Sequence, residues 1–450
     1  MVAVGEPSPV RGRVTAMAFR RDLAYAAFLN EGATMKRIAI LFGIVVLAGC
    51  RGGNSTPPEP EPEPVPPPAE WSADMQAVAD GNNHFALELY GKLSEAEKGK
   101  NLFFSPYSIH TALGMTATGA KGTTRDQMVK VLHLPEDEQK ALACGDLGRY
   151  YAQPRKAFEL AVANSVWGQS GFPWRAEFLT LQKERFGAGF READFRTNPD
   201  TERVRINKWV ESKTHDRVKD LLRPEHIDKQ TRMVLANAIY FKGTWTTQFP
   251  TKKTRDVLFH LADGGRINVP TMYEEVKCRW GLINDVPGAK ILELPYSGGE
   301  LSMVVLLPKL PDGLPAIERR LAPDALSKWL EAMYHPTKPV GVSLPKFRFE
   351  RSYDLPEKLK ALGMVDAFID GMADLTGMTE VRLCITAVAH KAYIDVNEEG
   401  SEAAAATAVV VSESFGDPPA FTIEHPFLFL IRDVKHGTIL FLGRVTNPKG

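Results

Sequence analysis

Residues 398–411 read EEGSEAAAATAVVV and have no single structural preference. The run of four alanines favours helix, whereas the run of three valines favours strand. A segment whose local preferences conflict is suited to an element that adopts two states. The plainer alternative is an exposed alanine-rich loop or a short helix.

If the segment is a strand, one of its faces could enter a protein core. Successive side chains alternate between the two faces, so one face carries Ser401, Ala403, Ala405, Thr407, Val409 and Val411. The other face carries Glu402, Ala404, Ala406, Ala408, Val410 and Ser412. Only the first face is free of charge, and its leading residues are small enough to slide between closely spaced strands.

The rest of the chain predicts helices mostly early and strands mostly late. Helical spacing and start signals predict helices over residues 82–93, 105–120, 122–132, 201–222 and 355–362. Apolar and alternating runs predict strands over residues 233–242, 290–294, 301–307, 339–349, 427–431 and 438–445. Because there is no βαβ alternation, the expected class is α+β.

The composition is that of an ordinary globular protein and supports neither a nucleic-acid partner nor an enzyme. The 55 basic side chains are balanced by 55 acidic ones, so no global charge attracts a polyanion. No G-x-S-x-G, H-E-x-x-H or P-loop motif is present, and no catalytic residue is assigned. The cysteines form no C-x-x-C pair, which predicts no metal site. Cys144, Cys278 and Cys384 are expected to be small buried side chains.

The N-terminal region predicts a leader rather than part of the folded domain. Residues 1–34 contain no apolar run and are expected to be a mis-assigned extension, with the true start at Met35. Residues 35–49 join a basic start to a short apolar run, as in a signal peptide. The run ends in Leu47-Ala48-Gly49-Cys50, which resembles the bacterial lipobox and implies a lipid on Cys50. An uncleaved membrane anchor is the alternative.

Residues 50–73 predict a spacer between the lipid and a domain over residues 74–450. Residues 57–68 are nearly all Pro and Glu, so they should form an extended polyproline segment of roughly 40 Å. The lipid would anchor the protein to the membrane outside the cytoplasm. Arg51, in place of an aspartate after the cysteine, favours the outer membrane or the cell surface.

Six motifs between residues 74 and 448 resemble those of the serpin family and follow in the family's order. They are NLFFSPYS (101–108), INKWV (206–210), NAIYFKGTW (237–245), LPKF (344–347), EEGSEAAAATA (398–408), and HPFLFLIR with GRVTNP (425–448). The resemblance implies one α+β domain with three β-sheets, eight or nine helices and an exposed reactive-centre loop.

The resemblance also implies a function, that of a suicide-substrate inhibitor of serine or cysteine endopeptidases. In a serpin the protease attacks the loop and forms an acyl-enzyme, and the cleaved loop then inserts into the central sheet. Serpin loop insertion is itself a standard example of strand addition and of released strain. No cofactor is expected, since residues 134–147 are acidic where a heparin site would need basic side chains. A monomer is expected, and a non-inhibitory carrier or surface-binding serpin is the alternative.

Individual residues take their roles from the resemblance. The hinge of the loop runs from Glu398 and Glu399 to Ala408, with Gly400 giving backbone freedom at the turn. The shutter, a polar cluster under the central sheet, is assigned to Ser105, Ser108, Asn237 and His390. The breach, where insertion begins, is assigned to Trp245.

The scissile bond is placed by two counts that differ by one residue. The usual loop length counted forward from Gly400 gives Ser414–Phe415, and counting back from Pro426 gives Phe415–Gly416. Phe415 suggests a chymotrypsin-like target, Ser414 an elastase-like one, and Glu413 a glutamate-specific one. Residues 412–417 contain no basic side chain, which argues against a trypsin-like target. The expected partner is therefore a chymotrypsin-, elastase- or subtilisin-like protease.

Overall fold

The computed structural model describes residues 70–187, 189–336, 338–401 and 420–450. The chain divides into two units, Met1–Glu59 and Pro60–Gly450, and all described residues belong to the second. Several predicted features lie outside the described residues: the leader, Cys50, the spacer up to residue 69, the hinge from Glu402 onward, and the scissile candidates Glu413, Ser414, Phe415 and Gly416.

Ten α-helical segments occur among the described residues, and two of them are single turns. The longer helices are α1 (Ala73–Ala96), α2 (Pro106–Ala117), α3 (Gly122–Leu132), α5 (Ala143–Tyr151), α6 (Ala176–Phe186), α7 (Pro199–Lys213), α9 (Pro323–Glu331) and α10 (Pro356–Leu362). The single turns are α4 (Glu138–Ala141) and α8 (Leu314–Glu318), and short 3-10 helices span Pro224–His226, Thr251–Lys253 and Asp366–Phe368. The eight longer helices match the expected number.

The strands form three sheets, as expected. The central sheet has the order β11 (Phe347–Asp354), β12 (Ala387–Val396), β13 (Gly400–Ser401), β4 (Met233–Thr244), β2 (Phe158–Gln169), β3 (Phe190–Ala193). The second has the order β1 (Leu102–Phe104), β16 (Ile439–Val445), β15 (Phe427–Asp433), β9 (Leu301–Leu307), β8 (Lys290–Pro295), β7 (Arg279–Leu282). The third has the order β14 (Ala420–Thr422), β10 (Val340–Pro345), β6 (Arg266–Val276), β5 (Arg255–His260).

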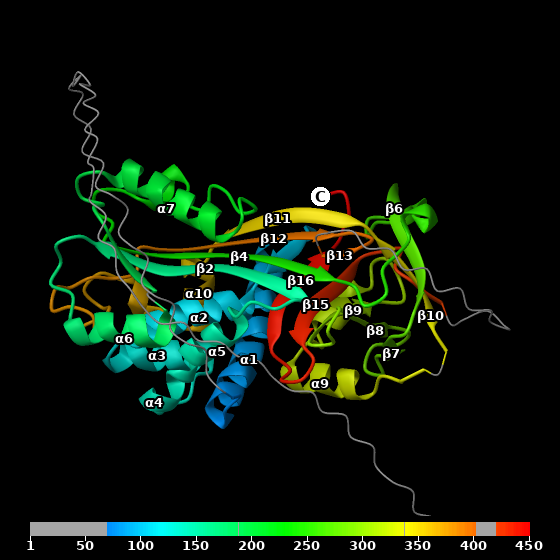
Figure 1. Cartoon of the computed structure of the whole chain (residues 1–450), viewed down its shortest axis with the longest axis horizontal. Helices are drawn as coiled ribbons and strands as arrows, with labels where there is room; N and C mark the ends of the chain where they lie inside the picture. The colour runs from blue at the N-terminus through cyan, green and yellow to red at the C-terminus, as the bar shows by residue number, and fades with distance from the viewer. Residues whose placement is uncertain (1–69, 188, 337, 402–419) are drawn as a thin grey trace, which may run out of the picture. The chain divides into compact units, whose positions relative to one another are not determined.

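The central sheet lies between two helical layers, with α7 on one side and α2 on the other (Figure 1). Every residue of α2 is buried, because this helix lies between the central sheet and the second sheet. On the opposite face, Ile206 and Val210 of α7 pack into a smaller apolar cluster with Tyr240 and Tyr393 of the sheet. The two faces of the sheet therefore meet different environments.

Three sequence predictions are wrong in detail. The helix expected over residues 201–222 ends at Lys213, because His215, Asp216 and Asp220 have φ values of 50°, 58° and 48°, which a right-handed helix cannot contain. One βαβ crossover exists after all, since β2 and β3 pair in parallel on either side of α6. Cys144 and Cys278 are buried as expected, but Cys384 is only half-buried.

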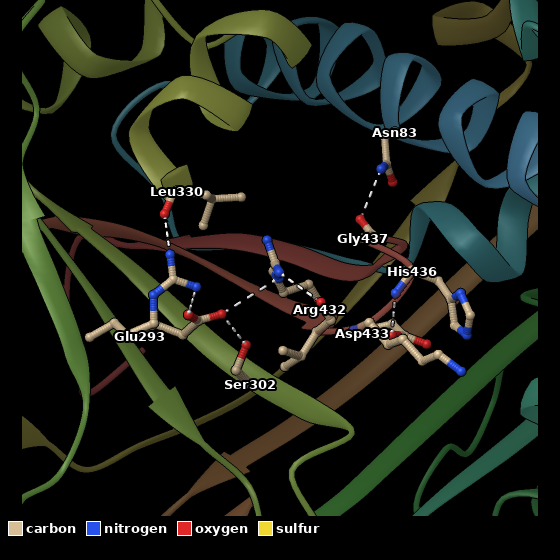
Figure 2. Close-up of polar contacts among 11 residues, drawn as sticks. Asn83, Glu293, Ser302, Leu330, Arg432, Asp433, His436 and Gly437 are labelled. Atoms are coloured by element: carbon tan, nitrogen blue, oxygen red, sulfur yellow. Dashed lines mark hydrogen bonds and ion pairs between the residues drawn. The ribbon is translucent and has the colours of Figure 1, made fainter. Parts of the chain in front are cut away.

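The two predicted C-terminal strands, β15 and β16, form an antiparallel hairpin that is bonded to the first helix (Figure 2). Asp433 accepts hydrogen bonds from the main-chain N–H groups of Lys435 and His436, both at 2.8 Å, which fixes the turn between β15 and β16. Asn83 of α1 donates to the Gly437 carbonyl at 2.9 Å. The two ends of the domain thus stabilise each other through side chain to main chain contacts.

Candidate functional site

Three polar residues lie directly opposite one another across the middle of the central sheet. The β2–β4 register pairs Asn164 with Asn237, and the β4–β12 register pairs Asn237 with His390. The β4–β12 pairing is parallel, whereas β4 pairs with β2 antiparallel. Asn237 and His390 are fully buried, and the first turn of α2 lies beneath them.

The start of α2 adds two serines to this row. Ser105 is the N-cap and Pro106 the first helical residue, the combination that favours a helix start at this point. The Ser105 hydroxyl accepts from the Ser108 N–H at 3.1 Å and donates to the Leu440 carbonyl of β16 at 2.7 Å. The Ser105 N–H donates to His390 Nε2 at 3.1 Å. The cap therefore links the helix to both sheets.

Asn237 is at the centre of the resulting network. Its Nδ2 donates to Ser108 Oγ at 2.6 Å and also to Asn164 Oδ1. Its Oδ1 accepts from His390 Nδ1. Ser108 Oγ donates in turn to Asn164 Oδ1 at 2.9 Å. Each buried polar group replaces its hydrogen bonds to water by hydrogen bonds to other members of the network, so the network is stable only while the strands stay together.

These contacts fix the protonation of His390. Since Nε2 accepts from the Ser105 N–H, the single ring proton must be on Nδ1, where it faces Asn237 Oδ1. A second proton on Nε2 would face another donor. Burial lowers the pKa of His390 to about 3, so the ring is neutral at physiological pH and the network carries no charge on this residue.

Trp245 follows the end of β4 and contacts the start of the predicted hinge. Its main-chain N–H donates to the Glu399 carbonyl at 2.9 Å, and its indole Nε1 donates to the Asn397 carbonyl at 3.0 Å. Its ring stacks on Tyr296 with centroids 4.5 Å apart and planes within 9°. The Tyr296 hydroxyl lies 2.7 Å from Ser401 Oγ. Both aromatic side chains thus hold the hinge at this position.

The hinge turns sharply after β12 and begins to run back along it. Asn397 and Gly400 exchange two main-chain hydrogen bonds of 2.9 and 3.2 Å, which close the turn. Ser401 then pairs antiparallel with Val396 of β12 on one side and with Gly243 of β4 on the other. The φ of Gly400 is +155°, and a Cβ there would be 1.9 Å from the Gly243 carbonyl oxygen. Only glycine fits so close to β4.

Glu398 is the charged anchor of this turn. Its carboxylate accepts from Lys346 Nζ at 2.7 Å and from Thr254 Oγ1 at 2.8 Å. Burial raises the pKa of Glu398, but the hydrogen bonds from Lys346 and Thr254 outweigh burial, and the net effect is a pKa below the ordinary value. Its carbonyl also accepts from the Phe249 N–H at 2.8 Å.

The structure therefore brings the predicted residues together in two groups. Ser105, Ser108, Asn237 and His390 form one hydrogen-bonded cluster, and Trp245 meets the first hinge residues about Gly400.

Sequence reasoning missed Asn164, Tyr296 and the partnership of Lys346 with Glu398. Asn164 could have been found as the polar residue within the apolar run AVANSVW on the strand next to Asn237. Tyr296 follows a predicted strand and carries no local signal. Lys346 is part of the motif LPKF, but nothing local in the sequence indicates its partner.

The described residues contain neither a candidate metal site nor a candidate membrane span. No group of three or more His, Cys, Asp or Glu residues in this part of the chain could hold a metal ion. Within the same residues, no helix combines the length and the apolar character needed to cross a bilayer.

Comparisons with known proteins agree on one family. The family model "Serpin (serine protease inhibitor)" matches residues 80–448. Leukocyte elastase inhibitor A of Rattus norvegicus is 39% identical over 380 residues, covering 83% of this chain and 100% of the relative.

Two solved structures share the fold. Serpin48 of the insect Tenebrio molitor is 34% identical with a TM-score of 0.72, over 84% of this chain and 100% of its own. Human thyroxine-binding globulin is 28% identical with a TM-score of 0.77, again over 84% of this chain and 100% of its own. The chain therefore belongs to the serpin family, and the relative that it matches in sequence is a protease inhibitor rather than an enzyme.

Proposed function

We propose that the chain is a suicide-substrate inhibitor of serine endopeptidases, and of cysteine endopeptidases by the same route. The cleaved loop would insert between β4 and β12 and trap the acyl-enzyme before deacylation. The single observation that carries the proposal is the position of Gly400 and Ser401, which already lie between these two strands and pair with both.

The two registers of the hinge allow insertion to continue without sliding of the sheet. Ser401 lies opposite Gly243 of β4 and Val396 of β12. Six residues further along both strands are Asn237 and His390, which already face each other. An inserted strand that keeps these registers needs only a sideways separation of β4 and β12 by about one strand spacing, ~4.8 Å. It also replaces one parallel ladder by two antiparallel ones, which are slightly more stable per residue.

The side chain of Ser401 indicates which face of the hinge would enter the core. Ser401 is fully buried and contacts Tyr296 of the main apolar core. By strand alternation, Ala403, Ala405 and Thr407 would follow it on this inner face. These side chains are small and uncharged, as an inner face requires.

The hinge turn also contains one unfavourable group. Among the described residues, Glu399 Oε2 is buried without a hydrogen-bond partner. A buried polar atom left unpaired costs about 1–3 kcal/mol. Glu399 precedes the two hinge residues that are already paired in the sheet, so this cost belongs to the turn itself.

The experiment that tests the proposal is a gel-shift panel of the purified domain with chymotrypsin-, elastase-, subtilisin- and papain-like proteases. We expect an SDS-stable complex with at least one of them, together with a higher melting temperature of the loop-cleaved protein. Absence of any complex, with equal melting of cut and intact protein, would refute the proposal. Mass-mapping of the released C-terminal peptide distinguishes cleavage at Ser414–Phe415 from cleavage at Phe415–Gly416.

A carrier function is the second candidate, because the fold is also similar to that of a protein named for binding thyroxine. A carrier does not need an insertable hinge. The Ser401 contacts and the small residues that follow favour the inhibitor. A cut chain that melts like the intact one while binding a small apolar molecule would favour the carrier.

We also propose that a lipid on Cys50 anchors the domain to the outer membrane or the cell surface. This rests on the motif at residues 47–50 alone, and the relatives named above are animal proteins without bearing on it. Expression in a bacterium should give a mature N-terminus at Cys50 with attached acyl chains, read by mass spectrometry. Cys50→Ser should release the protein into the soluble fraction, and an unmodified, uncleaved N-terminus in the wild type would contradict the proposal.

A further inference from the structure

A small pocket of about 110 Å³ lies where helices α2, α3, α4 and α6 meet (Figure 1). Its lining includes none of the shutter or hinge residues. The apolar part of the lining is aliphatic and consists of Ala117, Val129, Leu134, Ala141, Leu142 and Leu181. Ala117 and Leu134 are each 7% exposed, Leu142 is 8% exposed, and the other three are half-buried. A small molecule can therefore reach these side chains.

Three polar side chains of the lining are already paired within the protein. Thr118 Oγ1 donates to a main-chain carbonyl of α2 at 2.7 Å and accepts from Gln182 Nε2 at 2.9 Å. Arg125 Nη2 donates to the Glu136 carbonyl at 2.9 Å, and Arg125 Nε lies 3.2 Å from Glu138 Oε1. Because the one cation and the one anion of the lining compensate each other, an ionic ligand would lose water without gaining a free partner there.

One wall of the pocket can move while the core stays folded. α4 contributes Glu138, Gln139 and Ala141 to the lining, and it has four residues, none of which is buried. Its cap is Asp137, whose carboxylate accepts from the Gln139 and Lys140 N–H groups at 2.8 and 3.2 Å. A single helical turn without a buried side chain is at the low end of local stability. Displacement of this turn gives a ligand a way in.

We propose that the pocket binds a small neutral alcohol with a compact aliphatic body. An engineered protein cavity of about 150 Å³ holds one benzene molecule, so a pocket of about 110 Å³ is matched to one small ring or a branched chain of about five or six carbons. The aliphatic lining would bury this body. The hydroxyl would lie beside the exposed side chain of Gln139, whose amide can both donate and accept a hydrogen bond.

An NMR titration of the whole protein tests the binding step, with cyclohexanol as the probe. We expect a dissociation constant of about 1 mM, the range open to a ligand this small. Cyclohexanecarboxylate and cyclohexylammonium should bind about tenfold more weakly, because each would bury a charge without a free partner. Equal or tighter binding of the carboxylate would mean that Arg125 and Lys121 attract an anion, and it would overturn the neutral chemistry. Absence of cyclohexanol binding would overturn the site.

Two substitutions on α4 form a matched pair. Ala141→Leu fills the pocket from an exposed helix and should abolish binding. Lys140→Leu introduces the same side chain one residue earlier, outside the lining, and should leave binding unchanged. Gln139→Ala should weaken cyclohexanol about two- to tenfold, as expected when one hydrogen bond between neutral groups is lost. Wild-type affinity in Ala141→Leu would overturn the site, and wild-type affinity in Gln139→Ala would overturn the placement of the hydroxyl.

Hydrogen exchange tests the part played by α4. The Ala141 N–H is bonded to the Asp137 carbonyl at 3.0 Å and the Leu142 N–H to the Glu138 carbonyl at 3.3 Å, so their exchange reports displacement of this turn. With cyclohexanol at about ten times its dissociation constant, both should exchange about tenfold more slowly. The Leu326 N–H of α9 is the control and should not change. Binding without slower exchange in α4 would overturn its role as the movable wall.

The pocket does not rest on the proposed function. Titration and exchange need no protease, and the gel-shift panel needs no alcohol, so the two proposals fail separately. Binding of cyclohexanol alone does not favour the carrier, whose test also requires equal melting of the cut and intact chains.

Discussion

Thr407→Val should destabilise the loop-cleaved protein and leave the intact protein nearly unchanged. Continuing the two hinge registers places Thr407 between Asn237 and His390, opposite both. Insertion separates these two residues by about one further strand spacing, ~4.8 Å, which breaks the bond from His390 Nδ1 to Asn237 Oδ1. The Thr407 hydroxyl would take the vacated position, where it can accept from His390 and donate to Asn237.

The size of the effect follows from the burial of His390. Valine has nearly the shape of threonine but cannot hydrogen-bond, so the His390 Nδ1–H would be left unpaired at a fully buried site. The expected cost is about 1–3 kcal/mol in the cleaved form. A domain spanning residues 74–450 has an unfolding entropy of about 0.8 kcal/mol/K, so the melting temperature should fall by about 1–4 °C.

Scanning calorimetry of the cut and intact forms of the same variant is the assay, with the intact form as the internal control. We expect a fall in melting temperature only after cleavage. A similar shift in both forms would mean that Thr407 acts outside the sheet. No shift in the cut form would mean that the hinge registers do not continue to Asn237, and the insertion argument would then fail.

Four further results are expected. Asn237→Ala should lower the free energy of unfolding of the intact protein by about 1–3 kcal/mol, because it leaves the buried His390 Nδ1–H without its acceptor; the exposed Asn268→Ala is the matched control in urea unfolding. Gly400→Ala should cost about 1–3 kcal/mol through steric overlap and backbone strain, and should slow insertion in stopped-flow fluorescence. Because the folded pKa of His390 is lowered to about 3, its contribution to stability is complete above pH 6.5 and is lost as the pH falls below that value. Urea unfolding at pH 5.5 should therefore show about 1 kcal/mol less stability from this residue than at pH 7, and His390→Gln should remove that part of the slope. Phe415→Arg should transfer SDS-stable complex formation from chymotrypsin-like to trypsin-like proteases.

The sequence predicted the parts of the site that lie within short motifs. The Ser105-Pro106 start signal located α2 because a cap and a first-turn proline act locally. The apolar run of β4 located Asn237, since a buried strand is visible from its own residues. The family resemblance supplied the remaining step, that these elements meet in one cluster with His390.

Long-range pairing could not be obtained in this way. Glu398 and Lys346 are 52 positions apart, and neither has a neighbour in sequence that indicates the other. Asn164 is on a strand that no start signal marks. The false extension of α7 past Lys213 has the opposite cause, since apolar spacing continued while the backbone turned left-handed at His215. The spacing of apolar residues alone does not detect such a break in a helix.

The order of residues in the hinge also fits the two faces of the sheet that it would enter. On the outer face, the continued registers place Ala404 between Tyr240 and Tyr393, which now lie opposite each other with ring centroids 6.1 Å apart under the α7 cluster. A separation of about 4.8 Å between these strands admits a backbone and a methyl group, and a longer side chain would have to displace α7. On the inner face, the position that would lie between Asn237 and His390 is occupied by Thr407. Thr407 is the one hydroxyl residue between Glu402 and Val411. A run of alanines broken by a single threonine is therefore what this sheet requires of a strand that must pass between β4 and β12, and a helix or a loop would have no reason to place that threonine six residues after Ser401.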